Sequence, residues 1–469
     1  MSSDYNDHAS AKRRYMHVAF AAYLGSLSIG LAVGFSSPAM EELAGEFDKL
    51  DKSLFGSILT IGALIGGLLA GVAGEKIGRR GTILATTGLF SVGWLLVLTR
   101  QNAAMLYSAR FILGTACGIN CMIVPVYLGE VSTPEHRGML GTGHQFSTVF
   151  GVFIAYCLGS VINVTLLAIA SLVPVAATTI MFFMPESPTW LVKKGRPDTE
   201  LMFSLYSLFG RTRYAEAQRD ILMDLKEDDG SYFTISDMVR PPILKPLGLA
   251  LSLMFLQQMS GINAVIFYMK DIFASAKTSI DENVEAIIIG GIQVIFTIPT
   301  AIMIDRAGRR VLLHIAGIIE AVGLALLISF YLIKHSYPET ASHMAFLPVS
   351  ALSLYVTGFA IGYGPIPWLM MGELIPDRAR GVGTGLLTAF NWFCAFLVTN
   401  LFPKIMDHFG EEVAYGIFLG IVSIGVIYVF VFIPETKGKT FEEIEIMFQS
   451  PQLDISIESG GQRNGLQVV

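Results

Sequence analysis

The sequence predicts an all-α membrane protein whose twelve transmembrane helices form two similar halves. Three observations support this class. Of the 469 residues, 53% are hydrophobic and only 15% are charged, whereas soluble domains carry about 25% charged residues. Apolar runs of bilayer-spanning length, about 20 residues each, recur along the chain. The third observation is a set of charged motifs that occurs twice, at corresponding places in the two halves.

Net charge and cysteine content exclude other classes. The chain has 32 Lys and Arg and 38 Asp and Glu, a net charge of −6, so no nucleic-acid partner is expected. Cys117 and Cys121 are four residues apart without a His or an acid beside them, which favours small buried side chains over metal ligands. No nucleophile–base set or phosphate loop is present, so we expect no enzyme, no metal and no cofactor.

The spans are predicted as helices because the apolar runs are continuous and do not alternate at every second residue. The predicted spans are 17–37, 54–74, 82–99, 104–129, 139–162, 164–184, 246–270, 283–304, 311–333, 346–371, 381–403 and 412–433. An even number of spans places both termini on one side of the membrane.

Lys and Arg placement predicts that this side is the cytoplasm. In the short loops, twelve basic residues lie on the side of the termini and seven on the opposite side, and cytoplasmic loops carry such an excess. The 16-residue N-terminus has no adjacent leucine pair of the endosomal sorting type, which favours the plasma membrane over an endomembrane. The expected parts are a cytoplasmic N-terminus at 1–16, a six-helix half at 17–184, a cytoplasmic helical linker at 185–245, a second half at 246–433 and a cytoplasmic tail at 434–469, disordered after about 445.

The two halves share three charged motifs. Acid-basic-x-Gly-Arg-Arg follows the second and eighth spans, Glu-x6-Arg-Gly follows the fourth and tenth, and Pro-Glu closes the sixth and twelfth. The residues concerned are Glu75 to Arg80 and Asp305 to Arg310, Glu130 with Arg137 and Glu373 with Arg380, and Pro185-Glu186 and Pro434-Glu435. Two similar halves around a central site are typical of alternating-access transporters.

These motifs resemble the sugar porter branch of the major facilitator superfamily. So do Gln257-Gln258-Met-Ser-Gly-Ile-Asn263 and Gly364-Pro-Ile-Pro-Trp368. Within that branch, Ser36-Ser37-Pro38 and the Gly358–Gly362 segment resemble the class III facilitative glucose transporters and related trehalose facilitators. The resemblance covers about residues 17–445. It implies a uniporter that moves a neutral sugar, a hexose such as glucose, by alternating access, with the sugar and the lipid bilayer as partners and a monomer as the functional form.

Neutral sugars need side chains that donate and accept hydrogen bonds, beside an aromatic face. Matching the family's sugar-contact positions, the residues expected to bind substrate are Gln145, Gln257, Gln258, Asn263, Gln293, Trp368 and Asn391. For any one amide, bonding to a neighbouring helix is the alternative, and Trp392 is expected to pack. Ala360 stands where the family usually has a Glu, which leaves the choice of sugar open among glucose, fructose and trehalose.

Two gates are expected. Phe267 and Tyr268 are candidates for an outer gate, with core packing as the alternative. A cytoplasmic charge network is expected to pair across helix ends and to hold the inner side shut. Its members are Arg79, Arg80, Glu130, Arg137, Glu186, Arg309, Arg310, Glu373, Arg380 and Glu435. Gly362, Gly364, Pro365 and Pro367 predict a hinge in span ten.

Proton coupling decides between the remaining functions. In symporting relatives an Asp in span one faces the Arg of span four; here the Arg is Arg110 and the span-one residue is Ala32. Arg110 is expected to meet a partner or a water-filled cavity, or else to snorkel to the interface. Glu320 is an acid inside span nine without an assigned role. Uniport is therefore favoured, with a proton-coupled symporter, a trehalose facilitator and a non-transporting sugar sensor as alternatives.

Overall fold

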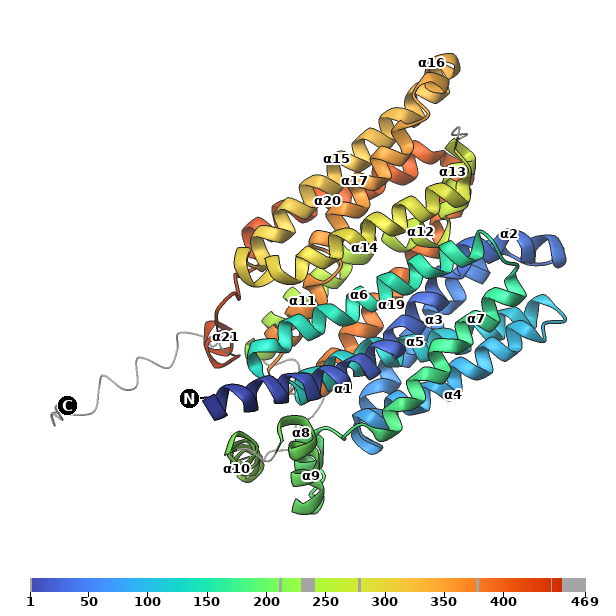
Figure 1. Cartoon of the computed structure of the whole chain (residues 1–469). Coiled ribbons are helices and arrows are strands. Elements are labelled where there is room, and N and C mark those ends of the chain that lie inside the picture. Colours follow the sequence, from blue (N-terminus) through green and yellow to red (C-terminus); the bar gives the residue numbers. More distant parts are fainter. Residues whose placement is uncertain are drawn as a thin grey trace, which may run out of the picture.

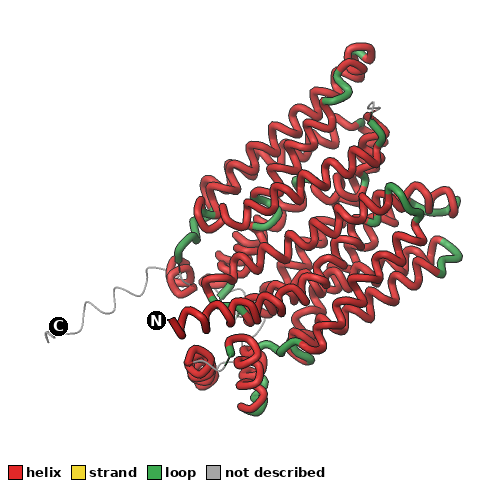
Figure 2. Tube along the Cα trace, viewed as in Figure 1, coloured by secondary structure: helices red, strands yellow, loops and turns green. Residues whose placement is uncertain are grey.

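The computed structural model describes residues 2–210, 213–228, 241–276, 280–376, 379–439 and 441–448. Within these ranges the chain forms helices, turns and loops and no strand (Figure 1, Figure 2). The long helices run side by side in one bundle. The N-terminus, α8 to α10 and α21 lie at one end of it, which we name the terminal end (Figure 1). The loop around α2, α13 and α16 lie at the other end, which we name the far end.

The first half of the bundle contains the first six predicted spans. Its helices are α1 (Ser2–Gly34), α2 (Ser36–Glu46), α3 (Lys52–Lys76), α4 (Arg79–Leu98), α5 (Ala103–Val131), α6 (Pro134–Gly159), α7 (Val164–Thr178) and the 3-10 helix η1 (Thr179–Phe183). Three short helices then pack at the terminal end, as expected for the linker; they are α8 (Pro188–Lys193), α9 (Asp198–Phe209) and α10 (Arg213–Asp228).

The second half contains the other six spans. Its helices are α11 (Pro241–Met259), α12 (Ile262–Phe267), α13 (Met269–Ala276), α14 (Glu282–Ala307), α15 (Arg309–Ser336), α16 (Pro338–His343), α17 (Leu347–Ile361), α18 (Ile366–Leu374), α19 (Arg380–Phe409) and α20 (Glu411–Phe432). The halves meet along two helix pairs, α3 with α19 and α6 with α14. These pairs join spans two and eleven and spans five and eight, so the interface repeats the internal duplication.

Eleven helical segments in the described ranges are long and apolar enough to cross a membrane. They coincide with the predicted spans except the fifth, predicted at 139–162. That position is occupied by α6, whose polar residues, such as His144 and Gln145, lower its hydropathy. Because α6 packs against α1 and α14 inside the bundle, it fills the place of the remaining span.

Two spans are broken near their middles. Span ten divides into α17 and α18 at Gly362–Pro365, which confirms that these residues interrupt the helix, as predicted for a hinge there. Span seven divides at Ser260 and Gly261, and Gly261 adopts φ +101°. That break is not predicted from the sequence, because a single Gly in an apolar run does not distinguish a helix break from a packing contact.

The described end of the chain differs from the prediction. A short helix, α21 (Phe441–Phe448), packs against α11 and α18 with Ile444 buried. The expectation of disorder beginning at about 445 is therefore wrong for residues 445–448. Apolar residues at helical spacing hold this segment against the bundle, and residues 449–469 lie outside the described ranges.

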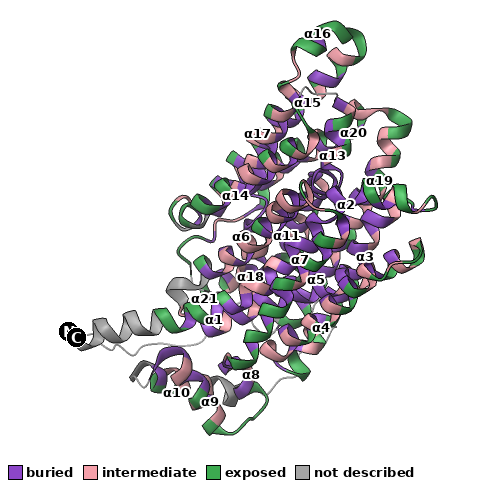
Figure 3. Ribbon diagram, turned by 45° about the vertical axis from the view of Figure 1, so that its right-hand side comes forward, coloured by how far each residue is buried: buried purple, intermediate pink, exposed green. Residues whose placement is uncertain are grey.

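Glycines allow the central helices of the first half to touch backbone to backbone. A Cβ atom at Gly62 would lie 2.1 Å from the Phe111 carbonyl oxygen of α5, and one at Gly66 would lie 2.2 Å from that of Thr115. These two glycines therefore serve the packing of α3 on α5. Buried residues accordingly concentrate in the middle of the bundle, and exposed residues dominate the projecting α16 (Figure 3).

Candidate functional site

Four of the predicted substrate-binding side chains form one hydrogen-bonded cluster, which we name the amide cluster: Gln257, Gln258, Asn263 and Asn391. Asn263 Nδ2 donates to Gln258 Oε1 at 2.5 Å, and Gln258 Nε2 donates to Asn391 Oδ1 at 2.8 Å. Asn391 Nδ2 in turn donates to Gln257 Oε1 at 2.7 Å. All four side chains are buried, the most exposed being Asn263 at 7%. The cluster therefore offers paired donors and acceptors in an otherwise apolar interior.

The helix breaks position this cluster. Gln257 Nε2 donates to the carbonyl oxygens of Tyr363 and Gly364, at 2.7 and 2.9 Å. Pro367 has no N–H to bond the Tyr363 carbonyl four residues earlier, so the Gln257 amide satisfies a group that the span-ten break releases. At the other break, the turn at Gly261 places Asn263 against Gln258, because the chain changes direction between α11 and α12.

The remaining predicted substrate-binding residues lie on other helices. Gln145 belongs to α6 and Gln293 to α14, the two helices that pack together across the half interface. Trp368 lies on α18 and is half-buried. Trp392 is buried beside Asn391 in the sequence, and its Nε1 has no hydrogen-bond partner among the described residues.

At the far end, polar contacts join the two halves. Ser53 Oγ donates to the Asn400 carbonyl oxygen at 3.1 Å, and Asn400 Nδ2 donates to Ser57 Oγ at 3.2 Å. The Tyr156 hydroxyl donates to the Ile266 carbonyl oxygen at 2.7 Å. These bonds tie α3 and α6 of the first half to α19 and α12 of the second, so the far end is closed.

The predicted gate residues lie within this closure. The Tyr268 hydroxyl donates to the Thr399 carbonyl oxygen at 2.9 Å, and its ring stacks on Phe402 with centroids 6.2 Å apart. The hydroxyl also lies against Gly56 of α3, where a Cβ atom would be 2.8 Å from it. Phe267 is fully buried beside it. Both residues thus contact the half interface.

An ion pair lies at the rim of the closed far end. Lys52 Nζ is 3.8 Å from Asp271 Oδ1, and both side chains are nearly half exposed. Burial raises the pKa of the Asp271 carboxyl, and the Lys52 ammonium opposes this by lowering it. An exposed pair of this kind contributes less than about 1 kcal/mol.

Arg110 is fully buried in α5, so the snorkelling alternative is excluded. Its guanidinium donates to the Ala32 carbonyl oxygen at 2.6 Å and to the Ser36 hydroxyl. It also lies over the Phe55 ring, 5.0 Å from the centroid. Among the residues that the structure describes, no ion pair involves Arg110, so backbone, hydroxyl and aromatic groups solvate this charge.

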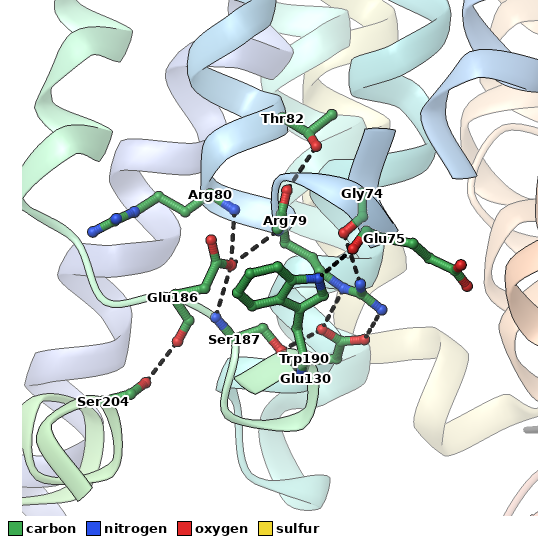
Figure 4. A network of polar contacts seen from close by, with 11 residues as sticks. Gly74, Glu75, Arg79, Arg80, Thr82, Glu130, Glu186, Ser187, Trp190 and Ser204 are labelled. Carbon is green, nitrogen blue, oxygen red and sulfur yellow. Dashed lines mark hydrogen bonds and ion pairs between the residues drawn. The ribbon is translucent and has the colours of Figure 1, made fainter. Parts of the chain in front are cut away.

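At the terminal end, the first half carries a connected charge network (Figure 4). Arg79 makes two hydrogen bonds to the Glu130 carboxylate, each at 2.9 Å. Glu186 Oε1 accepts from the backbone N–H groups of Arg79 and Arg80 at the start of α4, where a helix N-terminus favours negative charge. Ser187 Oγ donates to Glu130 at 2.5 Å. The network fastens α4, α5 and the start of the linker together.

The second half repeats this arrangement. Arg309 Nη2 donates to Glu373 Oε1 at 2.8 Å, and Glu435 accepts from the backbone N–H groups of Arg309 and Arg310, each at 3.0 Å. Thr436 Oγ1 donates to Glu373 Oε2 at 2.6 Å, in the position of Ser187. The duplicated motifs therefore build duplicated contacts.

Each of these ion pairs joins helix ends within one half. The side chains of Arg137 and Arg380, also predicted as members of the network, lie outside the described residues. Ser187 and Thr436 are missing from the predicted set, although each follows the motif Pro-Glu directly. A hydroxyl residue at the same place in both halves is the signal that identifies them.

Comparison with known proteins identifies the family. The chain matches the family model described as "Sugar (and other) transporter" over residues 7–448. It is 36% identical over 461 residues to the protein named solute carrier family 2, facilitated glucose transporter member 8, from Bos taurus, covering 93% of this chain and 95% of the relative. It is 38% identical over 437 residues to facilitated trehalose transporter Tret1 from Drosophila virilis. That match covers 91% of this chain, which spans about half the length of the trehalose transporter (48%).

Solved structures share the fold. The proton:xylose symporter XylE, bound to 6-bromo-6-deoxy-D-glucose, superposes with a TM-score of 0.80 at 23% identity, covering 93% of this chain and all of that chain. The relatives are transporters and not enzymes. With the family model matching almost the whole chain, the protein belongs to the sugar transporters, in the sugar porter branch of the major facilitator superfamily.

Proposed function

We propose that this transporter is a uniporter that moves a neutral hexose such as glucose down its gradient by alternating access. The observation that carries the proposal is the amide cluster, which joins both broken spans to α19. A sugar hydroxyl both donates and accepts, so it can replace one amide partner without leaving the other unsatisfied. Gln145, Gln293 and Trp368 complete the site in this proposal, from α6, α14 and α18.

The breaks in spans seven and ten support a moving site. The amide cluster is bonded to the carbonyls of Tyr363 and Gly364 at the span-ten break. A sugar that displaces these bonds changes what holds the break in place. Substrate binding is thereby linked to the packing of α12 and α18, which follow the two breaks. Phe267 and Tyr268 act as the far-end gate, and the two charge networks keep the helix ends of each half together as the halves rock.

The surroundings of Arg110 support transport without a coupled proton. Coupling needs a titratable group whose charge changes during the cycle. Arg110 instead contacts the Ala32 backbone, Ser36 and Phe55. We place the terminal end in the cytoplasm, from the excess of Lys and Arg in its short loops, and the protein in the plasma membrane as a functional monomer.

The test is uptake of labelled glucose, fructose and trehalose by the purified protein in liposomes. We expect saturable glucose uptake that stops when the internal and external concentrations are equal. Empty liposomes and liposomes with the Asn391→Ala variant serve as controls. Absence of saturable uptake for all three sugars contradicts the proposal.

Trehalose is the second candidate substrate, because relatives named as trehalose facilitators are 38% identical to this chain. Ala360 also replaces the Glu expected in span ten, and a smaller side chain leaves more room for a second sugar ring. Faster uptake of trehalose than of glucose in the same assay selects this candidate.

A further inference from the structure

Glu320 is a buried acid that the proposed transport cycle does not use. It lies on α15, is fully buried, and both of its carboxyl oxygens lack a hydrogen-bond partner among the described residues. Burying an unpaired carboxylate ion in a membrane interior is strongly unfavourable, whereas the neutral acid is tolerated. The position is therefore suited to a carboxyl group that carries a proton.

Glu320 lies where α15 and α17 approach each other so closely that no side chain fits at Gly358. The Glu320 Cγ would lie 2.9 Å from a Cβ atom at Gly358 of α17, and the Ala316 carbonyl oxygen of α15 would lie 2.7 Å from the same Cβ. The two backbones are in direct contact at this point. Ionisation, which attracts water, is incompatible with this packing, so the charge on Glu320 and the contact between α15 and α17 depend on each other.

The groups that face Glu320 are few and uncharged. The phenols of Tyr355, on α17, and Tyr363, in the break that follows α17, are near enough to interact with it electrostatically. On α20, no titratable residue lies between Tyr415 and Tyr428, and on α14 none lies between Glu285 and Asp305. On α15 itself, the nearest titratable side chains are His314 and Tyr331, six and eleven residues away, which is about 9 and 16 Å along the helix.

Both phenols lead to a helix break. The Tyr355 hydroxyl donates to the Ser260 carbonyl oxygen, at 3.1 Å, at the break in span seven. Tyr363 lies in the break of span ten; its hydroxyl has no partner among the described residues, and its carbonyl accepts from Gln257. Glu320 is thus connected to the amide cluster through Tyr363 at the span-ten break, and through Tyr355 and then Ser260 at the span-seven break.

We propose that Glu320 is a proton-binding site that sets the rate at which spans seven and ten rearrange. The neutral acid keeps α15 packed on α17 and keeps the two helix breaks in their present arrangement. Loss of the proton admits water, loosens the Gly358 contact and slows the change between states. Influx and efflux change equally, because the proton does not cross with the sugar. Only the rate measurement that tests this inference depends on the proposed transport function.

The first test is equilibrium exchange of labelled glucose in liposomes, with the same pH inside and outside, from about pH 6 to about pH 9, the range in which buried carboxyls titrate. We expect the wild-type rate to fall at least roughly fivefold toward high pH. Glu320→Gln and the apolar Glu320→Met, both unable to ionise, are expected to keep the low-pH rate throughout. Glu339→Gln, at an exposed acid of α16, is the matched control and is expected to follow the wild type.

The second test is infrared spectroscopy of the wild-type protein. The wild-type spectrum is informative without a variant, and the measurement does not depend on transport. We expect a carbonyl stretching band of a protonated carboxylic acid that persists at neutral pH and is absent from Glu320→Gln. A wild-type spectrum without this band overturns the proposal, as does a Glu320→Gln variant whose exchange rate falls with pH as the wild type does. Failure of the wild type to move any sugar contradicts the proposed function instead, and the infrared band still decides the role of Glu320.

Discussion

The centres of the two halves differ, although their terminal ends are alike. In the second half, spans seven and ten are broken and four amides bond to one another and to backbone released by the breaks. In the first half, α3 and α5 run unbroken and touch through glycines, and the buried charge of Arg110 is fixed by backbone, a hydroxyl and a ring. The duplicated scaffold therefore has similar terminal ends and different centres. In the proposed function most of the substrate-binding side chains come from the second half, and the first half contributes Gln145.

The largest expected effect is a difference in sugar affinity between two variants, each of which replaces one buried amide side chain with Ala, one in each half. In the proposed site Asn391 is both a donor and an acceptor for the sugar. Loss of two such hydrogen bonds, at about 0.5–1.5 kcal/mol each, amounts to about 2 kcal/mol, so Asn391→Ala is expected to lower sugar affinity roughly 30-fold. The variant also removes the bonds of Asn391 to Gln257 and Gln258. Asn120→Ala, at an equally buried amide of α5 bonded to Thr86, is expected to lower stability and leave affinity unchanged. Binding isotherms and thermal unfolding of both variants measure this. Equal losses of affinity would remove the distinction between the halves.

The next effect concerns the gate, where the two halves touch. Gly56→Val places a side chain against the Tyr268 hydroxyl, and overpacking of about 1–3 kcal/mol is expected to hold the far end open and to slow transport roughly tenfold. Labelling of a cysteine introduced beside Tyr268, from the far side, is expected to increase. Gly45→Val, where a Cβ atom meets nothing within 4 Å, is the control. Unchanged labelling in Gly56→Val contradicts a gating role for Tyr268.

A smaller and symmetrical effect is expected at the charge networks. Glu130→Gln leaves Arg79 without its carboxylate, and Glu373→Gln does the same to Arg309. Each substitution is expected to destabilise the protein by about 1–2 kcal/mol, since the pairs are largely buried and charge-assisted. Thermal unfolding in detergent compares the two. A stable variant in one half and an unfolded one in the other would show that the duplicated contacts have unequal roles.

The smallest effect is expected for Lys52→Ala at the rim. Because both partners are nearly half exposed, loss of the Asp271 pair changes the closure of the far end by less than about 1 kcal/mol. Far-side labelling beside Tyr268 is expected to stay within roughly fivefold of the wild type. A larger change in labelling would show that the Lys52–Asp271 pair stabilises the closed far end more than an exposed ion pair is expected to.

The sequence predicts the scaffold well because its signals are long or repeated. Apolar runs define the spans, and the duplicated motifs predict that Arg79, Glu130, Arg309 and Glu373 belong to a charge network at helix ends. The fold decides that Arg79 pairs with Glu130 and Arg309 with Glu373. The Gly-Pro run likewise predicts the span-ten break. The span-seven break is not predictable in this way, because one αL glycine in an apolar run carries no distinct pattern.

The hydrogen bonds inside the amide cluster cannot be predicted from the sequence either. Gln258 and Asn391 are 133 residues apart, and their contact depends on how α11 meets α19, which is set by packing. The same holds for Glu320, whose neighbours Tyr355 and Tyr363 follow from the close approach at Gly358. Residue type predicts that such groups need partners, but the fold decides which partners they find.

The central claim is that sugar recognition in the second half operates without a coupled proton in the first. The most direct measurement uses liposomes preloaded so that glucose is equal on both sides, with an inward proton gradient imposed. We predict no net sugar uptake, because the charge of Arg110 is held by the Ala32 backbone, Ser36 and Phe55, none of which titrates. Accumulation of sugar above its equilibrium concentration, abolished by a protonophore, would contradict the account.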